Sequence, residues 1–200
     1  MRALACGLLI VSLFNAWGIS QPITIVAIDA GHGGDDTGGI GIDDLYEKEI
    51  VLKIAHLIAL EAVHFPRIKV ILTRSDDRSL SPAERLAAAQ GAHLAISLHL
   101  DFSYDPRARG ITALVPTNAQ SSSRALAEAL RLRLIASTRT LDRGTHQAPL
   151  WLRRLSIPAV QLTLGFLTNP EEARKLAQLA YQRRVAQAIL EGINDFLRSN

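Results

Sequence analysis

The chain has 200 residues, 48% of them hydrophobic, and a formal net charge of +3. This length and apolar content are typical of one domain with a sizeable buried core. The single cysteine excludes a disulfide-stabilised fold. Because the arginines are dispersed along the chain, the small positive charge does not indicate a nucleic-acid-binding protein.

Residues 1–20 are predicted to form a secretory signal peptide, which leaves 21–200 as the folded domain. Arg2 supplies a positive start, an almost unbroken apolar run follows it, and the small residues before Ser20 suit a signal peptidase. The alternative is an uncleaved membrane anchor, because about seventeen apolar residues is near the lower limit of a spanning helix. With cleavage the protein is expected to be periplasmic or secreted, in the cell envelope, without a membrane span and without the thiol of Cys6.

Hydrophobic periodicity and capping signals predict the elements of the first half of the domain. Ser81, Pro82 and Glu84 have the spacing of a capping box with proline at the first helical position, which predicts a helix start. In chain order the predicted elements are the strand Thr24–Asp29, the helix Glu47–His64, the strand Ile68–Thr73, the helix Ala83–Gln90 and the strand His93–His99.

In the second half, Asn169 followed by Pro170 and two glutamates predicts another helix start. The segment Thr138–Pro149 is polar and is predicted to be irregular. Alternating strands and helices predict an α/β fold, with a single domain whose mostly parallel central sheet is covered by helices on both faces. The remaining predicted elements are the strand Gly110–Val115, the helix Ser121–Ser137, the buried strand Pro158–Leu164 and the closing helix Tyr181–Leu197.

Three residues at the ends of predicted elements have the character of zinc ligands. His32 lies in a glycine-rich stretch after the first strand, Glu47 opens the first helix, and His99 ends the third strand. In open α/β sheets, sites form beyond the carboxyl ends of the strands, where both histidines fall. Two imidazoles and one carboxylate leave a zinc ion one open position for water. The sequence therefore predicts a catalytic Zn2+ site at this edge.

Each of these residues also has an ordinary structural explanation. His32 suits a loop, Glu47 suits a helix start favoured by the dipole, and His99 suits a buried histidine bonded to the backbone. His56 and His64, on the first predicted helix, are interpreted as surface or boundary side chains because the metal set is complete without them. The glycines do not predict a phosphate-binding loop, since no Gly-Lys-Ser/Thr follows them.

Five blocks of this sequence resemble, in order, the zinc-dependent N-acetylmuramoyl-L-alanine amidases. They cover nearly the whole predicted domain and are Asp29–Gly34, Leu45–Lys48, Leu72–Arg74 with Ala83–Leu86, Ser97–His99 and Gly165–Glu172. The resemblance implies a hydrolase that cleaves the amide between N-acetylmuramic acid and the L-alanine of the stem peptide in bacterial peptidoglycan. It also implies that His32, Glu47 and His99 bind zinc, which polarises the scissile carbonyl. Peptidoglycan is then the expected partner, with no nucleic acid and no protein partner indicated.

One position departs from the pattern of that family. By the resemblance, the family's catalytic glutamate lies on the last buried strand, two residues before the Gly-Phe pair, and this chain has Thr163 there. A threonine hydroxyl is a poor base near neutral pH, and general-base catalysis is typically worth about 10²–10⁴-fold. The alternative function is therefore a catalytically silent domain that binds zinc and either peptidoglycan or a protein partner.

A second departure places a new carboxylate near the predicted metal. The family usually has Ala-Asn after its Ser-x-His, whereas this chain has Leu100 and Asp101. Since residues two apart on a strand project to the same face, Asp101 is a candidate replacement base or an orienting partner for His99, and otherwise a solvated loop residue. Gln161 and His146 are further polar candidates. A zinc carboxypeptidase that cuts elsewhere in the peptide is a third functional alternative.

Overall fold

The computed structural model describes residues 22–199, so the predicted signal peptide, 1–20, lies outside the described residues. Its sheet consists of Thr24–Ala30 (β1), Ile68–Leu72 (β2), Leu94–Asp101 (β3), Ile111–Pro116 (β4), Asp142–Ala148 (β5) and Ala159–Phe166 (β6). The strand order is β2–β1–β3–β6–β4–β5. The first four strands of this order are parallel, whereas β4 and β5 are parallel to each other and antiparallel to β6. The predicted single α/β domain with a mostly parallel sheet is confirmed.

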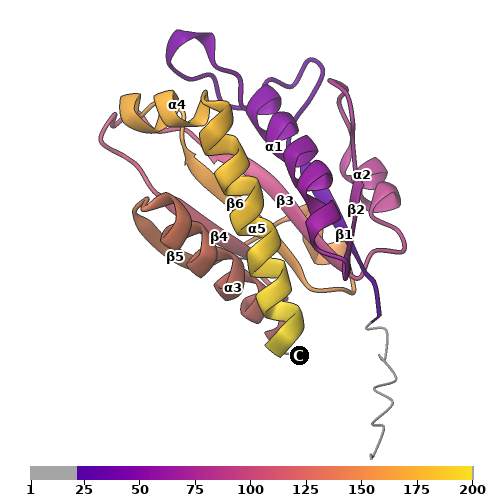
Figure 1. Ribbon diagram of the computed structural model, residues 1–200. Coiled ribbons are helices and arrows are strands. Elements are labelled where there is room, and N and C mark those ends of the chain that lie inside the picture. Colours follow the sequence, from indigo (N-terminus) through magenta and orange to yellow (C-terminus); the bar gives the residue numbers. More distant parts are fainter. Residues whose placement is uncertain (1–21, 200) are drawn as a thin grey trace, which may run out of the picture.

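Helices cover both faces of the sheet (Figure 1). The helices α1 (Glu47–Glu61), α3 (Ser121–Thr138) and α5 (Leu179–Ser199) lie on one face, with α5 packed between the other two. Aliphatic residues at alternate strand positions, such as Ile96 and Leu162, form the main core with these helices. On the opposite face, α2 (Pro82–Ala88) and the 3-10 helix Trp151–Arg154 pack near the amino ends of the parallel strands, over Ala27, Ala95 and Ala159.

Two predicted helix starts are confirmed by their side-chain caps. At α2, the hydroxyl of Ser81 accepts the backbone N–H of Glu84, and the Glu84 carboxylate accepts the N–H of Ser81. At α4 (Pro170–Leu176), the side chain of Asn169 accepts the N–H groups of both following glutamates. Because Asn169 follows β6 closely, this cap fixes the direction in which the chain leaves the last strand.

The prediction that Thr138–Pro149 is irregular is wrong over most of its length. Residues Asp142–Ala148 form β5, which pairs with β4 at the edge of the sheet. Every residue of this strand is exposed or half-buried. An edge strand needs only backbone pairing on one side, so charged and polar side chains suit it and the apolar alternation of a buried strand is absent.

The carboxyl ends of β1, β3 and β6 meet at one edge of the sheet, in the upper part of Figure 1, where α1 begins. On the sheet face opposite α1, α3 and α5, the strand residues between this edge and the alanines that α2 covers are polar. The edge is therefore the part of the fold in which the predicted ligands are brought together. No helix within residues 22–199 has the length and apolar character needed to cross a membrane.

Candidate metal centre

The three predicted zinc ligands lie together at this edge. His32 follows β1, Glu47 is the first residue of α1, and His99 lies near the end of β3. Oε1 of Glu47 is 3.1 Å from Nε2 of His32 and 3.0 Å from Nδ1 of His99. One ligand atom from each of the three residues lies within 4.8 Å of the others. Three distant parts of the chain thus bring two imidazoles and one carboxylate to one point.

This arrangement fits a zinc ion. Zinc bonds of roughly 2.0–2.1 Å in tetrahedral geometry separate neighbouring ligand atoms by about 3.3 Å, close to the 3.0 and 3.1 Å found here. Two ring nitrogens and a carboxylate oxygen are ligand types of catalytic zinc sites, which keep a fourth position open. The rings of His32 and His99 meet edge-on at 82°, so neither ring stacks over the other and both present a nitrogen to Glu47.

The loop that carries His32 is shaped by its backbone conformation. His32 has a φ of 59°, in the left-handed region, and Gly33 and Gly34 follow it with positive φ. Gly38 has a φ of 65°, and a Cβ at that position would lie 2.6 Å from the ring of His32 and 2.7 Å from Oε2 of Glu47. Glycine is therefore required at Gly38 both for the backbone turn and for the room that two ligands occupy.

Hydrogen bonds orient the ligands. Nδ1–H of His32 donates to the carboxylate of Asp36, whose two oxygens both lie 2.9 Å away. A metal ion at this position would therefore bind Nε2 of His32, as in the carboxylate–histidine pairs of zinc sites. Oε1 of Glu47 accepts the N–H of Leu100, and Oε2 accepts the N–H of Gly39, each at 2.9 Å. The carboxylate of Glu47 is thereby held from two sides.

The charges of the site favour a cation. Glu47 is only 4% exposed. Burial acts to raise the pKa of Glu47, but the hydrogen bonds from His32 and His99 outweigh it and hold that pKa far below its ordinary value. The hydrogen bond with Glu47 raises the pKa of His32 above its ordinary value of 6.5, although burial opposes this. Glu47 is therefore an anion at neutral pH, and a metal cation would replace the protons that it shares with the histidines.

Thr163 lies directly beside the ligand His99. The pairing of β3 with β6 sets His99 opposite Thr163, and β4 sets Thr112 on the other side of Thr163. The flanking residues Leu98 and Leu162 belong to the main core, so the three polar side chains project from the opposite face. Thr163 is buried, and within residues 22–199 its hydroxyl has no hydrogen-bond partner. This hydroxyl is available to a molecule bound at the centre.

The candidate base Asp101 is the last residue of β3 and is half-buried. Its Oδ1 accepts the backbone N–H of Phe102 at 2.8 Å. Between His99 and Asp101, β6 carries one more residue than β3, so that Phe166 pairs with Asp101; such bulges re-aim side chains near sites. The role of Asp101 as a base, or as an orienting partner of His99, stays a prediction.

The two further polar candidates lie outside the ligand cluster. His146 is exposed on β5, and its Nε2 lies 2.8 Å from the carbonyl oxygen of Arg143. The strands β4 and β6 separate β5 from the strand of His99. Gln161 pairs with Ser97, one row closer to the amino ends of the strands than His99. Neither residue belongs to the group of three metal-ligand candidates.

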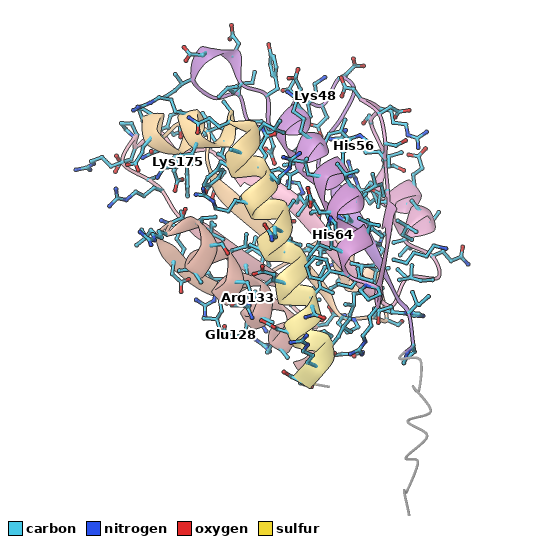
Figure 2. The ribbon with its side chains drawn as sticks, in the orientation of Figure 1. Lys48, His56, His64, Glu128, Arg133 and Lys175 are labelled. Carbon is cyan, nitrogen blue, oxygen red and sulfur yellow. The ribbon has the colours of Figure 1, made fainter. Side chains whose placement is uncertain are left out.

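The interpretation of His56 and His64 as side chains away from the metal is confirmed. His56 lies on α1 and His64 ends the 3-10 helix Ala62–His64 that follows it. Figure 2 shows the two histidines progressively farther from Lys48, which follows the ligand Glu47. Both histidines are exposed.

Sequence reasoning gave no role to four charged residues that surround the ligands: Asp29, Asp36, Arg74 and Arg85. The spacing of Asp36, four residues after His32, is a local signal that could have identified it. The contacts of Arg74 with Gly31 and of Arg85 with His32 connect residues 43 and 53 positions apart, and no local pattern predicts these.

The chain is similar in sequence to known proteins over most of its length. Residues 26–195 match the family model described as N-acetylmuramoyl-L-alanine amidase. The chain is 33% identical to the uncharacterized protein YqiI of Bacillus subtilis (strain 168), over 98% of this chain and 96% of YqiI. It is 34% identical to the N-acetylmuramoyl-L-alanine amidase LytC of the same strain, over 86% of this chain and 35% of LytC. The chain thus spans about a third of the length of LytC.

Solved structures show the same fold. The catalytic domain of CwlV, an N-acetylmuramoyl-L-alanine amidase from Bacillus (Paenibacillus) polymyxa var. colistinus, superposes with a TM-score of 0.82 and 32% identity, over 89% of this chain and 100% of that domain. An N-acetylmuramoyl-L-alanine amidase from Clostridium difficile 630 gives a TM-score of 0.85 and 31% identity, over 90% of this chain and 100% of that one.

Proposed function

We propose that this chain, which belongs to the N-acetylmuramoyl-L-alanine amidase family, is a zinc-dependent peptidoglycan hydrolase that cleaves the amide between N-acetylmuramic acid and L-alanine. The observation that carries the proposal is the convergence of His32, Glu47 and His99 within 4.8 Å. A signal peptide over 1–20 and a place in the periplasm or outside the cell are part of the same proposal, because its substrate is a cell-wall polymer.

In this proposal, each side chain at or beside the metal centre has a separate role. His32, Glu47 and His99 would hold the zinc ion, which supplies Lewis-acid polarisation of the scissile carbonyl. Asp36 fixes the ring of His32 through Nδ1. Thr163, beside His99, can donate its hydroxyl hydrogen to a carbonyl or amide of the bound peptide. Asp101 is proposed to take the proton of the attacking water and pass it to the leaving amine.

A second function is favoured by one observation, the position of Thr163. The pairing with His99 sets this residue next to a metal ligand, where a carboxylate of the family would act as base, and a threonine hydroxyl does not replace it at neutral pH. If Asp101 does not act as the base, the protein is a silent amidase-like domain that holds zinc and binds peptidoglycan or a protein partner.

An assay on purified sacculi separates these functions. The purified protein is expected to release stem peptides with a free L-alanine amino terminus. This release should stop when a chelator removes the metal and should resume when zinc is restored. In Asp101→Asn, release should fall by about 10²-fold or more while zinc stays bound. Unchanged release by Asp101→Asn would exclude Asp101 as the base. An inert wild-type protein that still binds zinc would support the silent domain, and a different new end would identify a carboxypeptidase.

A further inference from the structure

We propose that Arg74 and Arg85 are positioning residues that set the placement of the three metal ligands relative to one another. The inference rests on the proposed zinc site and extends it to residues behind the ligands. Both arginines lie in sequence blocks singled out above, Leu72–Arg74 and Ala83–Leu86, yet neither takes part in the ligand set. Both are buried, at 1% and 7% exposure.

Arg74 connects the segments of the first two ligands. Its Nη2 donates to the carbonyl oxygen of Gly31 at 2.8 Å and to that of Lys48 at 2.9 Å. Gly31 directly precedes His32, and Lys48 directly follows Glu47. A single nitrogen therefore joins the backbone beside one ligand to the backbone beside the other.

Arg85 connects the first ligand to the strand of the third. Its Nη2 donates to the carbonyl oxygen of His32 at 3.0 Å, and its Nη1 donates to Oδ1 of Asp29 at 2.6 Å. The other oxygen of Asp29 accepts the hydroxyl of Ser97 at 2.6 Å. Ser97 lies on β3, two residues before His99. Together the two arginines link all three ligand-bearing segments.

This network does more than stabilise the fold, because burying its charges costs free energy. Arg85 is paired with Asp29, whereas the hydrogen bonds of Arg74 go to carbonyl oxygens, and burying both guanidinium groups is costly because each charge loses its hydration. Burial, together with the neighbouring Arg85, lowers the pKa of Arg74. His32 holds a left-handed backbone, which a residue other than glycine keeps only where its surroundings impose it. The arginines impose it by binding the carbonyl groups of Gly31 and His32.

The test measures zinc affinity and fold stability separately. Lysine keeps the charge at position 74 but lacks the planar fork that reaches several carbonyl groups at once. We expect Arg74→Lys to raise the dissociation constant for zinc by about 10–100-fold in competition with a chromophoric chelator, and to alter the visible absorption of the Co2+-substituted protein. Arg133→Lys, on the surface of α3, is the matched substitution. Leu134→Ala, on the buried face of α3, provides a loss of stability remote from the site.

Both control variants should bind zinc as the wild type does. If Arg74→Lys also binds zinc with wild-type affinity, or weakens it no more than Leu134→Ala does at equal stability, the positioning role is wrong. Should Arg74→Lys not fold, Arg85→Lys decides, because it keeps the charge beside Asp29 but lacks the planar fork that also reaches the carbonyl oxygen of His32; unchanged zinc affinity overturns the proposal. Absence of zinc binding by the wild type would instead overturn the proposed function. The positioning role is then judged on metal-free crystal structures, in which Arg74→Lys should displace His32 from Glu47.

Discussion

Replacement of Thr163 by glutamate is expected to increase the rate of stem-peptide release from sacculi by about 10²–10⁴-fold if no other group of the wild type acts as the base. The reason is geometric. The side chain at this position projects from the sheet beside the ligand His99, and a carboxylate there can accept the proton of an attacking water, which the threonine hydroxyl cannot do at neutral pH. Release of new L-alanine amino termini, followed by chromatography, measures the effect.

Thr163→Gln is the matched control, because glutamine has the size of glutamate without its basicity. It should show no gain. Equal gains by Thr163→Glu and Thr163→Gln would mean that side-chain size, rather than proton transfer, limits the wild type. If Thr163→Glu gives no gain and the wild type is active, another group, with Asp101 as the first candidate, already acts as the base.

Replacement of Gly31 by alanine is expected to weaken zinc binding by about 100-fold or more. A Cβ at this position would lie 2.4 Å from Cε1 of His99 and 2.7–2.8 Å from its two ring nitrogens. Gly31 is not among the residues with positive φ, so alanine strains the backbone little and acts by displacing the ring of a ligand. Competition titration for zinc and thermal unfolding of the metal-free protein measure the two effects separately.

Gly91→Ala is the control for this substitution. Gly91 has a φ of 81°, and a Cβ there meets no atom within 4 Å, so alanine should lower stability through backbone strain and leave zinc affinity unchanged. A Gly31→Ala protein that binds zinc as tightly as the wild type would show that the ring of His99 can move away from Gly31 without loss of coordination.

Local sequence signals predicted most of this fold because most of its elements are either buried or capped. The helix starts at Ser81 and Asn169 followed from side chains that bond to the first turn. The strand β5 was missed because an exposed edge strand carries no apolar alternation. Apolar alternation therefore predicts buried strands and misses exposed ones.

The three ligands of the candidate site could be predicted because each lies at or near an end of a strand or helix. His32, Glu47 and His99 follow from the rule that parallel strands direct their carboxyl ends to one edge. The adjacency of Thr163 and His99 depends on the pairing of β3 with β6, two strands that are not consecutive in the chain. The arginine network likewise depends on contacts between distant segments. Such neighbours are set by the tertiary fold and have no signal in the local sequence.

The zinc content of the purified protein tests the central claim most directly. Elemental analysis should find one zinc ion per chain in the wild type and almost none in Glu47→Gln, which keeps the size of the ligand but removes its charge. A wild-type protein without zinc, or a Glu47→Gln protein that retains a full equivalent, would contradict the claim that His32, Glu47 and His99 hold one metal ion together.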